Sequence, residues 1–270
     1  MVPRIDLIAL DLDGTLLNSS DHVSAANRAA ISAALEAGVR VVIVTGRGAD
    51  AAGDVARELR LNLLIICAHG ALTKDVLTGK VIGHIPVPLQ YALPMIEFAD
   101  ENAIDAAVYV DERFHRLAGM PPYMSDMQEP LWMEVESLKR VLTSAPTFLR
   151  FFGHDAVTAI RETFADLPVH FKYETWGDFE ELAVTSLEAT KKNALMRLCR
   201  DHNISRKHVM AVGDSRNDVP MLRWAWIGVA MGNALAEVRE SVRYVTAPND
   251  RDGVALAIER FCAPRERKSA

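Results

Sequence analysis

Five short runs of consecutive apolar residues constrain the fold of this chain more than any other feature. Because the runs are continuous and do not alternate with polar residues, they indicate strands that are covered on both faces in a parallel sheet. The runs are residues 5–10, 41–44, 63–67, 209–212 and 227–230. Three of them precede residue 70 and two follow residue 205, so we expect both halves of the chain to contribute to one sheet.

Helical patterns lie between these runs. Ser24 is suited to cap a helix that continues to residue 37 and stops at Gly38, because a serine oxygen accepts from free helix amides and glycine ends helices readily. A second helix fits residues 190–202. Strands and helices that alternate in this way predict a doubly wound α/β core with a mainly parallel, Rossmann-like sheet.

The middle of the chain has a different composition. Residues 84–185 contain most of the prolines, and strand candidates at 106–110 and 147–152 are mixed with helical stretches. We interpret this interval as an inserted α+β cap domain, so that residues 1–83 and 186–270 form the α/β core. The alternative is one continuous α/β domain.

Polar side chains follow four of the predicted core strands. Asp11 and Asp13 come after the first, Thr45 after the second, His69 after the third and Asp214 after the fourth. Ligands of open α/β sheets bind beyond the carboxyl ends of the strands, where these groups should meet. Carboxylates that meet there repel one another unless a cation lies between them, and oxygen ligands alone suit Mg²⁺.

Four motifs appear in order along the chain. They are DLDGTLL at residues 11–17, VTGR at 44–47, Lys191 within TKKNAL at 190–195, and GDSRNDVPML at 213–222. Together they resemble the haloacid dehalogenase superfamily. The segments VAMGNA at 229–234 and DGVA at 252–255 are similar to its Cof-type phosphatase branch, which carries a C2 cap.

The resemblance implies a magnesium-dependent phosphatase that acts on small phosphorylated metabolites such as sugar, nucleotide or cofactor phosphates. Asp11 would be the nucleophile that forms an aspartyl-phosphate, and Asp13 the general acid and base. Thr45 and Lys191 complete the implied catalytic set. Two rival functions remain open: a phosphomutase or phosphotransferase on the same scaffold, and a catalytically silent protein that binds phosphometabolites.

The resemblance also implies how the ligands are held. Mg²⁺ would bind the Asp11 carboxylate, the Asp13 carbonyl and the Asp214 carboxylate, with Asp218 as a water-mediated or orienting partner. The implied substrate-binding residues are Leu12, Thr45, Gly46, Lys191 and Asn217, with Gly46 at the start of a helix. The cap itself offers aromatic and polar candidates for substrate contact, most of which are better explained as core packing: Tyr123, Trp132, Phe152, His154, Tyr173 and Trp176.

One position departs from the related branch. Relatives usually carry Asn-Gly-Ala after the third strand, whereas this chain has Ala68-His69-Gly70-Ala71. A single histidine is most often a structural hydrogen-bonding residue. The alternative is that His69 contacts substrate or the hinge between the domains.

Composition excludes several other classes of protein. The net charge is −6, and the one basic cluster, Arg265, Arg267 and Lys268, is best explained as a solvated terminus, so we expect no nucleic-acid partner. The three cysteines are unpatterned, and no apolar stretch is long enough for a leader or a membrane span. We therefore expect a cytoplasmic monomer or weak homo-oligomer with no membrane partner.

Overall fold

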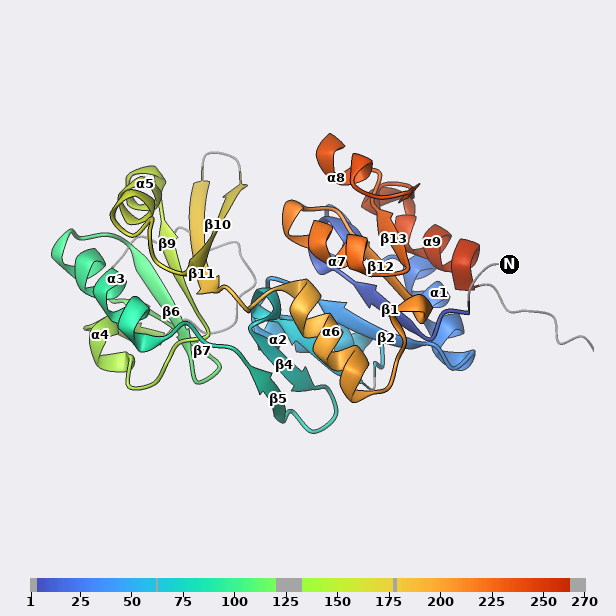
Figure 1. Ribbon diagram of the computed structural model, residues 1–270, viewed down its shortest axis with the longest axis horizontal. Helices are drawn as coiled ribbons and strands as arrows, with labels where there is room; N and C mark the ends of the chain where they lie inside the picture. The colour runs from blue at the N-terminus through green and yellow to red at the C-terminus, as the bar shows by residue number, and fades with distance from the viewer. Residues whose placement is uncertain (1–3, 62, 120–132, 177–178, 263–270) are drawn as a thin grey trace, which may run out of the picture.

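A computed structural model describes residues 4–61, 63–119, 133–176 and 179–262. It contains two sheets, which lie in two lobes of the molecule (Figure 1). Among the described residues, no helix combines the length and apolarity that a membrane span requires. The basic cluster at 265–268 lies outside these residues.

The larger sheet has the strand order β14-β13-β12-β1-β2-β3-β4-β5. Its strands are β1 Leu7–Leu10, β2 Arg40–Val44, β3 Leu64–Cys67, β4 Leu72–Asp75, β5 Val81–His84, β12 Val209–Gly213, β13 Ile227–Ala230 and β14 Tyr244–Val245. Pairing is parallel from β14 to β3 and antiparallel for β4 and β5. The order places β1 between β12 and β2, so the first apolar run lies at the centre of the sheet.

Helices cover both faces of this sheet, as the continuous apolar runs predict. The helices are α1 Ala25–Glu36, α2 Ala49–Glu58, α6 Lys191–Asp201, α7 Val219–Trp224, α8 Ala236–Glu240 and α9 Gly253–Cys262. Ile8 of β1 shares one apolar cluster with α1, α2 and α9, whereas its neighbour Leu7 shares another with α6, α7 and α8. The predicted doubly wound α/β core is therefore confirmed.

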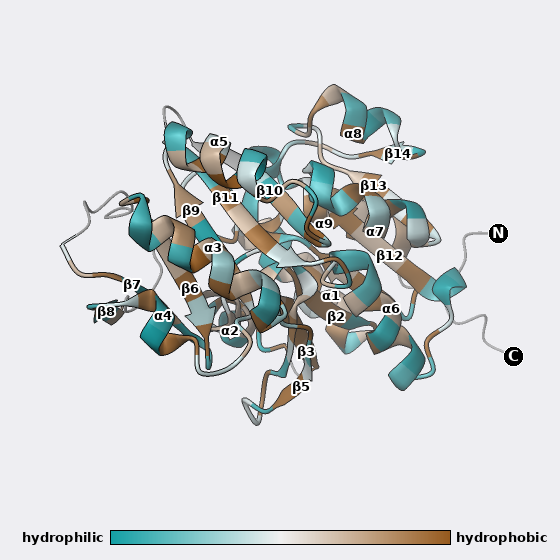
Figure 2. Cartoon of the chain, turned by 60° about the vertical axis from the view of Figure 1, so that its left-hand side comes forward, coloured by the Kyte–Doolittle hydropathy of each residue, from teal (hydrophilic) through white to brown (hydrophobic). Residues whose placement is uncertain are grey.

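The smaller sheet has the strand order β10-β11-β9-β6-β7-β8. Its strands are β6 Ala106–Val110, β7 Arg113–Leu117, β8 Met133–Val135, β9 Phe148–Phe152, β10 Val169–Trp176 and β11 Phe179–Ser186, and its helices are α3 Leu89–Glu101, α4 Leu138–Val141 and α5 His154–Thr163. The helices pack on one face through residues such as Ile96 and Ile160. Figure 2 shows hydrophobic residues along strands such as β12 and β13, and both hydrophilic and hydrophobic residues on the helices.

The opposite face of the smaller sheet packs on the core. Tyr109 of β6 and Phe148 of β9 belong to the same apolar cluster as α1 and α2. The strands that flank the predicted insertion end at His84 and Ser186. His84 pairs with Leu72 in the larger sheet, and Ser186 pairs with Val169 in the smaller one.

Candidate active site

A tight turn after the central strand positions the first two candidate aspartates. Asp11 follows β1 directly, and residues Leu12–Leu16 form an irregular π-helical turn in which Gly14 has φ +68°. A Cβ atom at Gly14 would lie 2.4 Å from Oδ2 of Asp214. Only glycine therefore allows the turn to adopt its left-handed backbone while Asp214 lies against it.

Lys191 joins two of the candidate carboxylates. It is the first residue of α6, whose N-cap Thr190 accepts from the amide of Asn193. Its Nζ donates to Oδ1 of Asp11 and to Oδ1 of Asp218, both at 2.7 Å, and all three side chains are buried. A lysine is unfavourable at the positive end of a helix, so this position is explained by the two carboxylates rather than by the helix.

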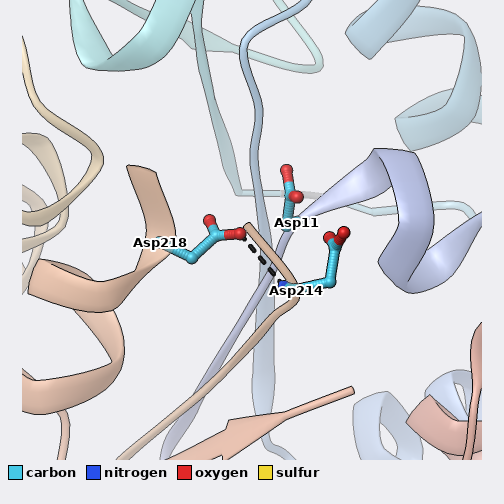
Figure 3. A group of neighbouring side chains, drawn as sticks. All are labelled: Asp11, Asp214 and Asp218. Atoms are coloured by element: carbon cyan, nitrogen blue, oxygen red, sulfur yellow. Dashed lines mark hydrogen bonds between the residues drawn. The ribbon is translucent and has the colours of Figure 1, made fainter. Parts of the chain in front are cut away.

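Asp218 accepts hydrogen bonds from several groups of the site. Besides Lys191, it accepts from the amide of Asp214 at 3.1 Å and from the amide and hydroxyl of Ser215 at 3.0 Å each. Figure 3 shows Asp11, Asp214 and Asp218 close together, with the bond from the Asp214 amide to Asp218. Four donor groups therefore surround the carboxylate oxygens of Asp218.

Burial and mutual repulsion act on the carboxylates in this cluster. Burial is the main reason why the pKa of Asp11 is raised well above 3.8, and the charge of Asp218 raises it further although Lys191 opposes them. Burial and Asp218 likewise raise the pKa of Asp214 to about 6. Burial alone lowers the pKa of Lys191, but the charges of Asp11 and Asp218 outweigh burial and raise it.

The cluster has the chemistry of a divalent cation site. One oxygen each from Asp11, Asp214 and Asp218 lies within 4.8 Å of the others. Lys191 supplies one positive charge to three carboxylates, so a divalent cation would balance the negative charge that remains. The donors are oxygen atoms alone, which fits Mg²⁺.

The Asp13 side chain lies outside this group of ligand oxygens. Its carboxylate is more than half exposed and accepts from Arg47, whose Nε lies 3.0 Å from Oδ1 and 3.1 Å from Oδ2. Arg47 also pairs with Asp21. The Asp13 side chain is thus separate from the buried cluster.

The second motif differs from the sequence prediction in one respect. Gly46 does not start a helix: α2 begins at Ala49 with Gly48 as its N-cap. The reason is that residues 45–47 bond to the next loop, since His69 N donates to Thr45 O at 3.0 Å and Ala68 N donates to Arg47 O at 2.8 Å. Tyr109 of the smaller sheet accepts from the freed Ala49 amide at 3.3 Å.

The remaining predicted substrate residues surround the same strand ends. Leu12 and Thr45 are fully buried, and Thr45 Oγ1 accepts from the Arg47 amide at 3.1 Å. Asn217 is half-buried, and its Oδ1 accepts from Ser215 at 2.9 Å. Asn217 would therefore meet a ligand through its Nδ2 amide.

His69 is buried, with 3% of its surface exposed, and has φ +57°. Its Nδ1 has no hydrogen-bond partner among the described residues. The structural hydrogen bond that a lone histidine usually makes is therefore not found at this atom.

The candidate substrate contacts from the predicted cap differ in their exposure. Phe152 is buried, whereas His154 and Tyr173 are exposed, and His154 lies 3.0 Å from Glu180. Tyr123 and Trp132 lie outside the described residues, as does the side chain of Trp176. The smaller sheet approaches the second motif instead through Tyr109 and Phe114, which contact Gly48.

Sequence reasoning missed three residues that shape the site. Thr15 donates to Oδ1 of Asp214 at 2.8 Å, Ser215 donates to Asp218, and Asn233 Nδ2 donates to Gly14 O at 2.8 Å. All three lie inside motifs that the sequence analysis quoted. Their hydroxyl and amide groups beside the aspartates were the signal that could have found them.

Comparison with known proteins places these motifs in one family. The haloacid dehalogenase-like hydrolase profile matches residues 8–258. A putative phosphatase of Bacillus subtilis, YxeH, is 32% identical over 94% of this chain and 97% of its own length. The pyridoxal phosphate phosphatase YbhA of Escherichia coli is 29% identical over 93% of this chain and 97% of its own length. A haloacid dehalogenase-like hydrolase from Bacteroides thetaiotaomicron superposes with a TM-score of 0.86, at 27% identity, over 95% of this chain and 99% of its own.

Proposed function

The chain belongs to the haloacid dehalogenase-like hydrolase family and is a phosphatase of small phosphorylated metabolites; we propose that it uses Mg²⁺ and forms an aspartyl-phosphate on Asp11. The observation that carries this proposal is the contact of Lys191 with Asp11 and Asp218, beside Asp214. At the end of the central strand, this contact places the ammonium group of Lys191 beside the buried carboxylate of Asp11. The carboxylate oxygens that would bind Mg²⁺ lie at the same place.

In the first step, a carboxylate oxygen of Asp11 attacks phosphorus, and the bond from phosphorus to the leaving oxygen breaks. Asp13 gives its proton to that oxygen. In the second step, Asp13 takes a proton from water, the water oxygen attacks phosphorus, and the Asp11 carboxylate is released. The inorganic phosphate formed carries the oxygen of that water.

The residues that would hold Mg²⁺ are the carboxylates of Asp11 and Asp214 and the carbonyl of Asp13, with Asp218 orienting the first two through Lys191 and the Asp214 amide. When bound, Mg²⁺ neutralises charge on the nucleophile and on the phosphoryl oxygens. Thr15 fixes the rotamer of Asp214 by its hydrogen bond. Asp218 would thus stabilise the cation site by holding the ligands Asp11 and Asp214 in place.

We assign the phosphoryl oxygens to donors at the ends of β1, β2 and β12. Lys191 supplies a positive charge at the nucleophile, where charge on the phosphoryl group develops. Leu12, Thr45, Gly46 and Asn217 would complete the cradle. The Gly46 and Leu12 contacts would come from the backbone, since glycine has no side chain and that of leucine is apolar.

Residues 84–185 would act as the cap that closes this site. Two contacts between this interval and the core support the proposal: Tyr109 with the Ala49 amide, and the Lys74–Glu112 ion pair. A closed cap excludes water from the phosphoryl group and positions the leaving group.

The experiment that tests this function measures phosphate release from sugar, nucleotide and cofactor phosphates and from p-nitrophenyl phosphate, with Mg²⁺ and with a chelator. We expect turnover that depends on Mg²⁺ and that is lost in the Asp11→Asn variant, which keeps the shape of the side chain. Turnover that persists in the chelator, or in Asp11→Asn, would refute the proposed mechanism.

A further inference from the structure

The loop after β3 has an unusual backbone. Ala68, His69 and Gly70 have φ values of +50°, +57° and +96°, and the first two are not glycine. Such conformations are strained for residues with a Cβ atom and persist where the surroundings enforce them. Here the bonds from Ala68 N to Arg47 O and from His69 N to Thr45 O fix the loop to the second motif.

This backbone directs the His69 ring against Gly46. A Cβ atom at Gly46 would lie 2.6 Å from Cε1 and 3.0 Å from Nδ1 of His69. The ring is 3% exposed, and its Nδ1 has no partner among the described residues. A buried polar atom without a partner is unfavourable, so a ligand that accepts a hydrogen bond from this atom would be favoured here.

A lysine of the smaller sheet lies near the loop that carries His69. Nζ of Lys172 in β10 donates to Ala189 O at 3.4 Å. The loop that carries His69 packs against Thr190, the residue after Ala189, because a Cβ atom at Gly70 would be 2.4 Å from Thr190 O. The ammonium group of Lys172 and the His69 loop therefore both adjoin the segment Ala189–Thr190.

His69 follows β3, on the β2 side of Asp11 along the edge of the sheet. β3 is separated from β1 by β2, so the loop after β3 lies roughly 10 Å from Asp11 across the sheet, at about 5 Å per strand. The phosphoryl group would lie between the ends of β1 and β2. A substituent of the leaving group could extend from there to His69.

We propose that His69 and Lys172 form a specificity subsite for an anionic oxygen group, a carboxylate or a second phosphate, on the leaving group of the substrate. The inference rests on the proposed phosphatase function and adds the chemical class of the substrate. Nδ1 of His69 would donate one hydrogen bond to that group, and Lys172 would supply a positive charge from the cap.

The charges around His69 fit an anionic ligand. Burial is the main cause that lowers the pKa of His69 well below 6.5, and Lys172, Lys191 and Arg150 lower it further. The imidazole is therefore neutral at physiological pH and can offer an N–H group. Since the charges that act on it are cationic, an anion at this place is attracted where a neutral group is not.

The test compares substrates that differ only in this group. 6-Phosphogluconate and glucitol 6-phosphate share a carbon chain but end in a carboxylate and a hydroxymethyl group. Fructose 1,6-bisphosphate and fructose 6-phosphate test a second phosphate in the same way. We expect kcat/KM to favour the anionic member of at least one pair by about tenfold, as one charge-assisted hydrogen bond allows. The pair that shows the preference identifies the anion as carboxylate or phosphate.

Two variants assign the preference to these residues. Asn accepts a left-handed backbone, so His69→Asn should fold, and Lys172→Gln removes only the charge. Each should reduce the preference by about fivefold or more, mainly through KM. The control is Lys139→Gln, an exposed lysine of α4 that pairs with Glu97, which should leave the preference unchanged.

The outcomes separate this inference from the proposed function. If neither p-nitrophenyl phosphate nor any of the metabolite phosphates is hydrolysed, both are refuted. If phosphate is released but neither substrate pair shows a preference for the anionic member, the subsite alone is refuted. A preference that survives in either His69→Asn or Lys172→Gln also refutes it.

Discussion

Both carboxylate oxygens of Asp13 are held by Arg47, whose Nε lies 3.0 Å from Oδ1 and 3.1 Å from Oδ2. The second motif thus fixes the side chain that we propose as the general acid and base. Because Arg47 N also donates to Thr45 Oγ1 at 3.1 Å, one residue couples the acid–base group to the proposed phosphate cradle.

The first prediction concerns this coupling. Arg47→Lys keeps the charge but loses the planar fork that holds two oxygens. We expect kcat/KM to fall about tenfold with a sugar phosphate and less with p-nitrophenyl phosphate, whose leaving group needs no proton. Steady-state kinetics of both substrates provide the measurement. Arg57→Lys, an exposed pair with Asp54 in α2, is the matched control. Equal losses on both substrates would show that Arg47 does not act through Asp13.

The second prediction concerns Asp13 itself. Asp13→Asn should lower turnover of a sugar phosphate by about 10²-fold or more, because an alkoxide needs a proton as it leaves. With p-nitrophenyl phosphate the first step should persist while breakdown of the intermediate slows. Rapid mixing should then show a burst of nitrophenolate before slow turnover. The absence of a burst, together with the same loss on both substrates, would assign Asp13 a structural role.

The third prediction compares two glycines with the same backbone. Gly14 has φ +68° and Gly79 has φ +69°, but a Cβ atom contacts Asp214 at the first and nothing within 4 Å at the second. Both alanine variants should lose about 1 kcal/mol of unfolding free energy through the left-handed backbone. Only Gly14→Ala should also need more Mg²⁺ for half-maximal activity. Equal Mg²⁺ dependence in the two variants would contradict the assigned contact with the metal ligand.

The fourth prediction concerns pH and Mg²⁺. Burial and Asp218 raise the pKa of Asp214 from 3.8 to about 6. The folded, metal-free protein therefore holds this proton more tightly than the unfolded chain. Its contribution to stability is present below about pH 4 and is lost as pH rises to about 6. Mg²⁺ should offset the repulsion of the ionised carboxylates, so it should raise Tm more at about pH 7.5 than at about pH 5.

Asp214→Asn provides the control for this pH effect. The variant removes one of the repelling charges, so we expect its metal-free form to be more stable than the wild type above about pH 6. Its Tm should respond less to Mg²⁺. Thermal unfolding in a chelator and in Mg²⁺, at both pH values, measures these differences. An equal Mg²⁺ response in the two proteins would remove Asp214 from the cation site.

Most of the core could be predicted from its sequence because local signals agreed with the fold. The apolar run at 227–230 became β13 without change, and Ser24 caps α1 as expected. The strand expected at 5–10 begins only at Leu7, where parallel pairing with Val209 begins. Apolar character alone does not show where a partner strand starts.

The sequence motifs identified the main residues of the site. They did not predict contacts that depend on how separate loops and the two lobes pack against each other. Asp11, Lys191 and Asp218 meet as the order of the strands requires. The helix start expected at Gly46 was wrong, because contacts with the loop at 68–69 and with Tyr109 of the smaller lobe displace it to Ala49. The proximity of Lys172 to the His69 loop depends on how the two lobes pack, which no local pattern encodes.

The central claim is that Asp11 carries the phosphoryl group, and chemical trapping tests it most directly. Borohydride reduces an acyl phosphate to an alcohol and thus converts a phosphorylated aspartate to homoserine. Protein quenched during turnover and mapped by mass spectrometry should carry homoserine at position 11, with more in Asp13→Asn and none in Asp11→Asn. Turnover without modification at position 11, or with modification of another carboxylate, would contradict the account.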